Sequence, residues 1–290
     1  NTGFMAMDPH NGYILAWVGG IDHRFFKFDH VTSKRQIGST FKPFVYANAL
    51  EKGTKPCDYF PNDSIVYENY NNWSPKNATR EYGGVYSLQG ALVNSVNTIS
   101  VQVLMEGGID STIQLAKDMG INTEFPKVPS LALGTLTASV KQMAEAYTGF
   151  AAHGKPLQGK ALLRIENSEG KVLEKFKSGS NPNPGQVLEA EVSEQITMML
   201  QHVVDRGTAR SLKDNFLFPA DVAGKTGTTQ DHADGWFVGY TPNLVFASWV
   251  GSEYPAVHFK DLTYGQGAAT ALPIAGYFLN DLYKHHPNSK

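Results

Sequence analysis

One stretch of the chain combines a lysine, small residues and hydroxyls in a pattern that suits peptide binding: Lys225-Thr226-Gly227-Thr228-Thr229. In an extended chain Lys225, Gly227 and Thr229 face one side, and Thr226 and Thr228 the other. The glycine leaves room for another backbone or a substrate to approach closely. An edge strand with a cation, hydroxyls and a free amide suits a carboxylate-bearing peptide that docks as an extra strand. The alternative is an ordinary edge strand protected by a lysine.

Two patterns nearer the start of the chain pair serines with a lysine and an asparagine: Ser39-Thr40-Phe41-Lys42 and Ser95-Val96-Asn97. Residues 40–51 have helical periodicity that ends at Gly53, so we expect Ser39 at or just inside a helix N-terminus with Lys42 on the same face. A serine hydroxyl is a poor nucleophile and needs a nearby base. Lysine serves as that base only when neutral, so burial or a neighbouring cation must lower its pKa.

A second Ser-x-x-Lys pattern, at Ser168 and Lys171, shows that this spacing alone is weak evidence. Strand-like runs at 162–165 and 172–176 flank it and predict a hairpin with the serine in its turn. Because no helix would hold the lysine against the serine there, we interpret this second pattern as ordinary polar residues of a hairpin turn.

The three patterns, in the order Ser-x-x-Lys, Ser-x-Asn and Lys-Thr-Gly, resemble those of penicillin-binding proteins and class A β-lactamases. Longer stretches are similar to the bifunctional, class A penicillin-binding proteins; these are residues 35–39, 73–77, 88–95, 131–134, 206–209 and 234–242. The resemblance runs from residue 3 to about residue 251. It identifies the chain as similar to a class A transpeptidase domain without its glycosyltransferase domain.

The resemblance implies a role for each polar residue of the patterns. Ser39 would be the nucleophile, Lys42 its base, and Ser95 a relay for the proton between Lys42 and the leaving amine. Asn97 would hydrogen-bond Lys42 and a backbone amide of the substrate. Lys225 would help supply the cation that lowers the pKa of Lys42.

The resemblance also places the substrate along the lysine-containing strand. Backbone N–H groups of Ser39 and Thr228 would form the oxyanion hole, assisted by the helix dipole. The hydroxyls of Thr226 and Thr228 would hold the substrate's terminal carboxylate, with Gly227 and Thr229 as further substrate-binding positions. The implied reaction is acyl transfer from a peptidoglycan stem peptide ending in D-Ala-D-Ala to an amine of a neighbouring stem, and a β-lactam antibiotic would stall as an acyl-enzyme.

Three other functions are alternatives. A serine β-lactamase needs a base that activates water, but the class A Glu-x-x-Leu-Asn pattern is absent between the second and third patterns, and the class D pattern would place Val at Asn97. A D,D-carboxypeptidase differs only in using water as the acceptor. A β-lactam sensor or a degenerate structural domain would be a binding module without enzymatic activity. The presence of all five polar motif residues argues against degeneracy; these are Ser39, Lys42, Ser95, Asn97 and Lys225.

Other polar and aromatic groups give weaker signals. Trp73, Tyr82 and Trp236 are candidate cleft residues, with core or loop packing as the alternative for each. The stretch 231–234 is interpreted as a turn and the histidine pair 285–286 as solvated surface. The sequence contains no His-x-x-x-His pair of the kind that binds a metal on a helix. We expect no metal and no cofactor.

Composition excludes several partners. The 290 residues carry 25 Lys and Arg against 27 Asp and Glu, which does not point to nucleic acid or an anionic membrane surface. A single cysteine, Cys57, excludes an internal disulfide. No apolar run approaches the length of a membrane span, and no signal peptide is evident. We expect residues 1–290 to be one penicillin-binding transpeptidase domain of a longer protein. By resemblance, the parent would be anchored in the bacterial cytoplasmic membrane with this domain outside it, among partners in cell-wall synthesis.

The expected elements place strands at both ends of the chain and helices between them. Strands are predicted at 3–7, 13–18, around Lys225, at 236–240 and at 244–251, and helices at 40–51, 88–93, 98–105, 111–119, 139–152, 191–206 and 268–284. The polar segment 54–87 is expected to be functional or stabilised by small elements of its own. This order predicts an α+β fold, with an antiparallel sheet of about five strands covered by helices on both faces.

Overall fold

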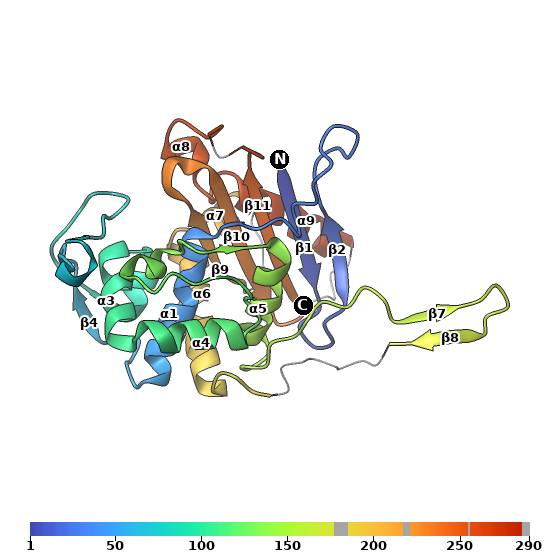
Figure 1. The fold of residues 1–290 in the computed structure, drawn as a ribbon, viewed down its shortest axis with the longest axis horizontal. Coiled ribbons are helices and arrows are strands. Elements are labelled where there is room, and N and C mark those ends of the chain that lie inside the picture. Colours follow the sequence, from blue (N-terminus) through green and yellow to red (C-terminus); the bar gives the residue numbers. More distant parts are fainter. Residues whose placement is uncertain (177–184, 217–220, 255, 286–290) are drawn as a thin grey trace.

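A five-stranded antiparallel sheet forms the centre of the molecule, in the order β2-β1-β11-β10-β9 (Figure 1). The computed structural model describes residues 1–176, 185–216, 221–254 and 256–285. The strands are β1 (Thr2–Met7), β2 (Ile14–Val18), β9 (Ala223–Thr228), β10 (Asp234–Thr241) and β11 (Leu244–Gly251). β1 pairs with β11 in a register that sets Thr2 opposite Val250, so the sheet joins the two ends of the chain.

The strands β10 and β11 form the buried middle of this sheet. Every residue of β10 is buried, and in β11 only Val250 is partly exposed. Aromatic and β-branched residues suit such strands because they pack well on a pleated surface, and Trp236 of β10 lies directly opposite Trp249 of β11. β2, by contrast, is an exposed edge strand.

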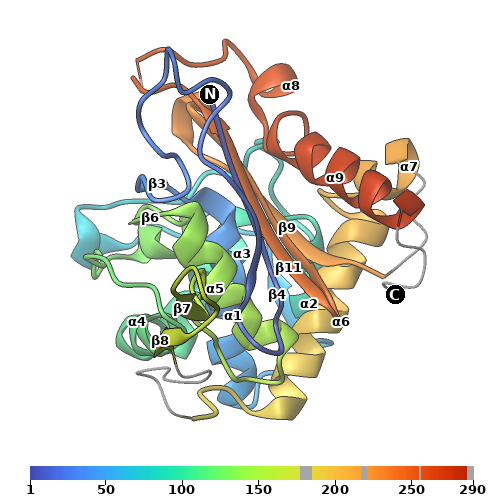
Figure 2. The ribbon, with the colours of Figure 1, turned by 90° about the vertical axis from the view of Figure 1, so that its right-hand side faces the viewer.

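Helices cover both faces of the sheet, which confirms the predicted α+β class (Figure 2). α5 (Val140–Ala151) packs against β1, β10 and β11 on one face, and α9 (Ala271–His285) packs against β10 and β11 on the other. α5 begins with a capping box between Ser139 and Gln142. The other helices are α1 (Lys42–Glu51), α2 (Leu88–Val93), α3 (Asn97–Gly107), α4 (Ile109–Asp118), α6 (Ala190–Arg206), α7 (Ser211–Phe216) and α8 (Leu262–Gly265).

α1 is the buried helix of the larger helical layer. Its residues from Lys42 to Leu50 are all buried, and it contacts α3, α4 and α6. A helix that is covered on every side needs no polar face. Pro43 occupies its first turn, where a missing N–H costs nothing, and Gly53 follows its end with a φ of +93°.

The long polar segment 54–87 contains small elements of its own, as expected. β4 (Tyr59–Pro61) pairs with β5 (Val85–Ser87), and a 3₁₀ turn, η2 (Glu68–Tyr70), lies between them. Elsewhere β3 (Arg35–Gln36) pairs with β6 (Thr137–Ala138). The sequence pattern did not predict β3, β6, α7 or α8, because elements this short carry too little periodicity.

A hairpin of β7 (Arg164–Glu166) and β8 (Val172–Lys175) projects from the body of the molecule (Figure 1). All its strand residues are exposed. The second Ser-x-x-Lys pattern lies in its turn, where Asn167 Oδ1 accepts the N–H groups of Glu169 and Lys171. Over the described residues, no helix is both long enough and apolar enough to cross a membrane.

Candidate active site

Ser39 lies in a 3₁₀ turn, η1 (Gly38–Phe41), that leads directly into α1. Gly38 has a φ of +54°, and a Cβ there would come within 2.8 Å of the carbonyl oxygen of Thr228. Glycine is therefore required for this turn to approach β9 so closely. As the sequence predicts, Ser39 sits half-buried at the N-terminal end of α1, beside an edge strand.

The amine of Lys42 is completely buried and surrounded by oxygen atoms. Nζ donates to the Ser95 carbonyl at 2.7 Å and to Asn97 Oδ1 at 2.7 Å, and it lies 3.1 Å from Ser95 Oγ. Burial, and secondly the positive charge of Lys225, hold the pKa of Lys42 well below its usual range. In the part of the chain that the structure describes, no hydrogen bond joins the hydroxyl of Ser39 to this amine.

A second buried lysine approaches the same serine from the sheet. Lys225 Nζ donates to Ser95 Oγ at 3.0 Å and to the Thr226 carbonyl at 3.1 Å. Burial lowers the pKa of Lys225 to about 7. The hydroxyl of Ser95 therefore lies between two buried amines, at hydrogen-bonding distance from Lys42 and from Lys225.

Ser95 itself has a left-handed backbone conformation, with φ +54°, between α2 and α3. This conformation is uncommon for a residue other than glycine and persists only where the surroundings impose it. The N–H of Ser95 donates to the Leu92 carbonyl at 3.1 Å, while its own carbonyl and hydroxyl both contact Lys42. The strained residue thus directs two oxygens at one amine.

Asn97, the first residue of α3, is oriented by two residues of the long polar segment. Its Nδ2 donates to the Lys76 carbonyl at 2.8 Å, which leaves Oδ1 facing Lys42. The backbone N–H groups of Asn97 and Thr98 donate to Asn77 Oδ1 at 2.9 and 3.2 Å, so a distant side chain caps the helix. No local sequence pattern signals this role, because Asn77 caps a helix that begins 20 residues later.

The backbone N–H of Thr228 faces the open edge of the sheet. In an antiparallel pair, successive residues alternately face toward and away from the partner strand. The N–H of Thr229 donates to the Asp234 carbonyl at 3.1 Å, so Thr228 faces away from β10. Since the turn at Gly38 packs against Thr228, the N–H groups of Ser39 and Thr228 belong to adjoining segments, as an oxyanion hole requires.

Among the residues that the structure describes, the hydroxyls of Thr226 and Thr228 each have one hydrogen-bond partner. Thr226 Oγ1 lies 2.8 Å from Thr208 Oγ1, in the turn that follows α6. Thr228 Oγ1 accepts the N–H of Gly267 at 3.0 Å. Each hydroxyl retains further hydrogen-bonding capacity for a substrate, because a hydroxyl has one donor and two acceptor positions.

Gly227 and Thr229, the other expected substrate-binding positions, are engaged by the protein itself. A Cβ on Gly227 would lie 2.7 Å from the Ile37 carbonyl oxygen and 2.9 Å from Thr40 Cγ2, so its open space admits the backbone of the Ser39 turn. Thr229 Oγ1 donates to Asp234 Oδ2 at 3.2 Å and accepts the Asp234 N–H at 3.0 Å. The hydroxyl of Thr229 is thus bonded to Asp234 within its turn, and its role in substrate binding stays a prediction.

Most of the chain matches a known protein family. Residues 2–272 match the penicillin binding protein transpeptidase domain. This chain belongs to that family. The predicted resemblance is therefore confirmed, and the chain is a transpeptidase domain.

Curated relatives extend well beyond this transpeptidase domain. This chain is 33% identical over 311 residues to penicillin-binding protein 1A of Rickettsia conorii. The alignment covers 99% of this chain and 39% of the relative. The chain is 33% identical over 291 residues to penicillin-binding protein 1A of Neisseria lactamica, which covers 98% of this chain and 36% of the relative. These relatives confirm the expected class A type, and the chain spans less than half of their length.

Solved structures confirm the fold of the transpeptidase domain. Penicillin-binding protein 1A from Haemophilus influenzae superposes with a TM-score of 0.88 at 26% identity, over 100% of this chain and 48% of that one. The PonA1 protein of Mycobacterium tuberculosis in complex with penicillin V gives a TM-score of 0.79 at 25% identity, over 97% of this chain and 77% of that one. A β-lactam thus binds a member of this family.

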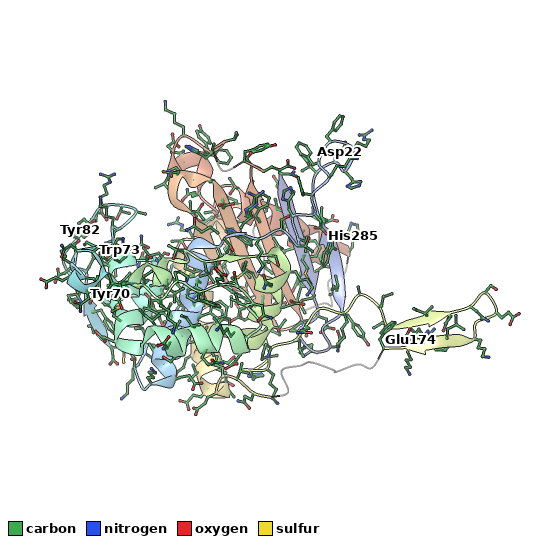
Figure 3. All side chains as sticks on the ribbon, in the orientation of Figure 1. Asp22, Tyr70, Trp73, Tyr82, Glu174 and His285 are labelled. Carbon is green, nitrogen blue, oxygen red and sulfur yellow. The ribbon has the colours of Figure 1, made fainter. Side chains whose placement is uncertain are left out.

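The three candidate cleft aromatics lie in different environments of the transpeptidase domain. Trp236 is fully buried, and its Nε1 donates to the Gln36 carbonyl at 2.8 Å, so it packs in the core and does not line a cleft. Trp73 is half-buried, with its ring centroid 6.2 Å from that of Tyr67, and Tyr82 is exposed. Figure 3 shows Trp73 and Tyr82 at the end of the molecule opposite the projecting hairpin.

A 3₁₀ turn, η4 (Gln230–His232), begins the stretch 231–234, and Asp234 is already the first residue of β10, so the expected turn ends before Asp234. Asp234 is buried, accepts the indole N–H of Trp249 at 2.8 Å, and has its pKa raised by burial. His285 Nε2 lies 3.6 Å from Asp281 Oδ1, while His286 is outside the described residues. Over the described residues no group of three or more His, Cys, Asp and Glu side chains is arranged to hold a metal ion.

Proposed function

We propose that this domain cross-links peptidoglycan stem peptides as a D,D-transpeptidase, through an acyl-enzyme on Ser39. The observation that carries the proposal is the position of the Ser95 hydroxyl, 3.1 Å from Lys42 Nζ and 3.0 Å from Lys225 Nζ. Burying two amines costs free energy, because burial removes them from water. Fold stability therefore does not account for this arrangement, whereas transfer of a proton through Ser95 does.

Lys42 is the base that activates Ser39. Because two neighbouring cations repel, the pair of lysines favours holding a single proton near neutral pH. The pKa of Lys42 is lowered by burial and by Lys225, so Lys42 is the neutral member of the pair. Neutral Lys42 accepts the hydroxyl proton as Ser39 Oγ attacks the carbonyl carbon of the penultimate D-alanine. Catalytic hydrogen bonds of this kind often tighten only when substrate binds.

Negative charge then develops on the substrate's carbonyl oxygen. The backbone N–H groups of Ser39 and Thr228 donate to this oxygen, and the N-terminal end of α1 adds a favourable dipole. As the tetrahedral intermediate collapses, the proton on Lys42 moves to Ser95 Oγ, and Ser95 passes its own proton to the nitrogen of the leaving D-alanine. Protonated Lys225, 3.0 Å from Ser95 Oγ, favours the anionic character that this oxygen acquires during the transfer.

The strand β9 orients the substrate. The hydroxyls of Thr226 and Thr228 donate to the terminal carboxylate of the stem peptide, and a negative charge there also favours the protonated form of Lys225. In the second half of the reaction an amine of a neighbouring stem attacks the ester on Ser39, and the proton path runs in reverse. Water as the acceptor would make the domain a D,D-carboxypeptidase, and fast hydrolysis of an antibiotic ester would make it a β-lactamase.

Intact-protein mass after incubation with benzylpenicillin, followed over hours, tests the proposal. We expect an adduct of one antibiotic per chain that persists and is missing from Ser39→Ala. An adduct that disappears quickly, with turnover of the antibiotic, would indicate a β-lactamase, and the absence of any adduct would contradict the proposal. Reaction with a peptide ending in D-Ala-D-Ala, with and without a D-amino acid as acceptor, distinguishes a transpeptidase from a D,D-carboxypeptidase. A transpeptidase forms the exchanged peptide in preference to the hydrolysed one.

We infer further that the parent protein carries a peptidoglycan glycosyltransferase and a membrane anchor, with this domain on the outer side of the bacterial cytoplasmic membrane. The share of the relative that the chain covers, 39% for the Rickettsia conorii protein, supports this inference. Cell-wall synthesis proteins would be its partners. Protease treatment of intact spheroplasts tests the placement, because only an outward-facing domain is degraded.

A further inference from the structure

We propose that Thr208 is a positioning residue that makes the hydroxyl of Thr226 a hydrogen-bond donor to the substrate's carboxylate. The inference rests on the proposed function, which places that carboxylate against β9. Thr208 Oγ1 lies 2.8 Å from Thr226 Oγ1, and Thr226 precedes Gly227 in the strand that carries Lys225. Thr208 therefore contacts a hydroxyl to which the proposed function gives a substrate-binding role.

The turn that carries Thr208 is fixed against the catalytic segments. The N–H of Thr208 donates at 3.3 Å to the carbonyl of Val93, which ends the helix leading to Ser95. A Cβ on Gly207 would lie 2.5 Å from the same carbonyl oxygen, so glycine permits this contact. The N–H of Gly207 donates to the Val203 carbonyl of α6 at 3.1 Å. Thr208 is thus held between the ends of two helices, and its hydroxyl has a defined position relative to β9.

The number of hydrogens on the two hydroxyls determines which one donates. Each hydroxyl has one hydrogen, and a carboxylate can only accept. When Thr226 donates to the carboxylate, its bond with Thr208 can form only if Thr208 is the donor. A chain from Thr208 to Thr226 to the carboxylate results, and each bond in such a chain polarises the next.

Thr228 receives a donor in the same way. Its Oγ1 accepts the backbone N–H of Gly267 at 3.0 Å, and a backbone N–H cannot reverse its role. The hydrogen of Thr228 is therefore left for the substrate. In the pair of Thr208 and Thr226 either hydroxyl can be the donor. Thr208 can therefore become the donor when Thr226 binds an anion, whereas the N–H of Gly267 always makes Thr228 an acceptor of that bond.

The test compares two probes that differ only at the carboxylate, benzylpenicillin and its methyl ester. The second-order rate constant for acylation of Ser39 is measured by mass spectrometry for the wild-type domain, Thr208→Val and Thr208→Ser. Valine keeps the shape of threonine and removes its donor. We expect Thr208→Val to slow acylation by benzylpenicillin roughly tenfold and acylation by the ester by no more than roughly twofold. Thr208→Ser should keep the wild-type ratio of the two rates.

A double variant provides a second readout. Because Thr208 acts through Thr226, adding Thr208→Val to Thr226→Val should cost little more than Thr226→Val alone. Additive losses would overturn the proposal, as would equal losses on both probes or no loss at all. Thermal unfolding checks that each variant is folded, and Thr208→Ala replaces Thr208→Val if valine prevents folding. Failure of the wild-type domain to be acylated by benzylpenicillin would instead overturn the proposed function, and this inference with it.

Discussion

At the scale of single residues, the site depends on two amines whose pKa values are lowered by burial. Lys42 and Lys225 are both completely buried, and burial is the largest cause of the lowered pKa of each. Asn97 accepts from Lys42 without adding charge. A neutral acceptor at this position orients the amine and leaves its pKa low, which a carboxylate would not do.

Replacing Asn97 with aspartate tests the protonation state of Lys42. Asn97→Asp would keep the side-chain shape and put a negative charge on the atom that lies 2.7 Å from Lys42 Nζ. This charge favours the protonated amine, so the pKa of Lys42 rises and less base is present. We expect acylation by benzylpenicillin at neutral pH to fall roughly a hundredfold, with the acidic limb of its pH–rate profile moved to higher pH. A profile whose acidic limb does not move would contradict the role of Lys42 as base.

Replacing Lys225 with methionine should make the fold more stable while it impairs acylation. The folded-state pKa of Lys225 is about 7, whereas a lysine in the unfolded chain titrates near its ordinary value of about 10.4. Between these values the unfolded chain binds a proton that the folded domain lacks, so stability rises with pH across this window, and below it the cost of burying the charge is fully present. We expect Lys225→Met to raise the free energy of unfolding at pH 6 by roughly 1–3 kcal/mol.

Urea unfolding at several pH values measures this effect. The advantage of Lys225→Met should shrink as pH increases from 7 toward 10, because releasing the proton of Lys225 on folding then costs progressively less free energy. Lys160→Met is a suitable control, since Lys160 is only partly buried and lies away from the site, bonded to the Asn11 carbonyl. An advantage that stays constant over this pH range would show that charge burial is not its cause.

At the scale of elements, the site depends on the close approach of the 3₁₀ turn η1 to the strand β9. Glycines on both sides make that approach possible: Gly38 on the turn lies against Thr228, and Gly227 on the strand lies against the Ile37 carbonyl. Ser39 and the N–H of Thr228, the proposed nucleophile and oxyanion donor, are therefore positioned by backbone contact.

Adding one methyl group to the strand should separate these elements. In Gly227→Ala the new Cβ would lie 2.7 Å from the Ile37 carbonyl oxygen, which is too close without movement of the turn. A displacement near 1 Å at a catalytic site can cost roughly a hundredfold in rate, and we expect such a loss in acylation by benzylpenicillin. Gly185→Ala is the control, because no atom of the described residues lies within 4 Å of a Cβ placed there. Equal acylation rates in the two variants would refute the importance of this contact.

The elements themselves were largely predictable from sequence. Periodicity gave α2 its observed bounds, Leu88–Val93, and placed Ser39 at a helix N-terminus. Alternation along β9 separated the faces of Lys225 and Thr226, but it does not report what covers each face. For that reason the burial of Trp236 and the use of the Thr229 hydroxyl within its turn were not predictable.

The bonds that orient catalytic side chains were the hardest part to predict. Asn77 caps α3, and Thr208 meets Thr226, through contacts between residues that no sequence period connects. Both residues belong to stretches that carried the family resemblance. The resemblance located them, and only the structure showed what they contact.

At the scale of the whole molecule, the projecting hairpin is separate from the catalytic body. Its strands form a two-stranded sheet of their own, and at its base the N–H of Phe176 donates to the Leu163 carbonyl at 3.0 Å. A two-stranded hairpin has little independent stability in water. The fold of the domain therefore gains little from it.

Removing the hairpin tests this separation. Residues 164–175 are replaced by Asn-Gly, which forms a tight turn between Leu163 and Phe176, two residues that a backbone hydrogen bond already joins. We expect acylation rates within roughly twofold of wild type and a stability change below about 1 kcal/mol. Measurement requires only the benzylpenicillin assay and a thermal scan. A large loss in either would show that the hairpin supports the catalytic body.

The pairing of β1 with β11 has a consequence for how the domain folds. Thr2 lies opposite Val250, so β1 must wait for a partner strand that is synthesised much later than β1 itself. Contacts this distant along the chain form slowly. β9 pairs with β10 of the same late hairpin, so Lys225 reaches Ser95 only when the sheet closes. Acylation by penicillin therefore reports completed folding, and an antibiotic adduct on a nascent chain would time the closure of the sheet.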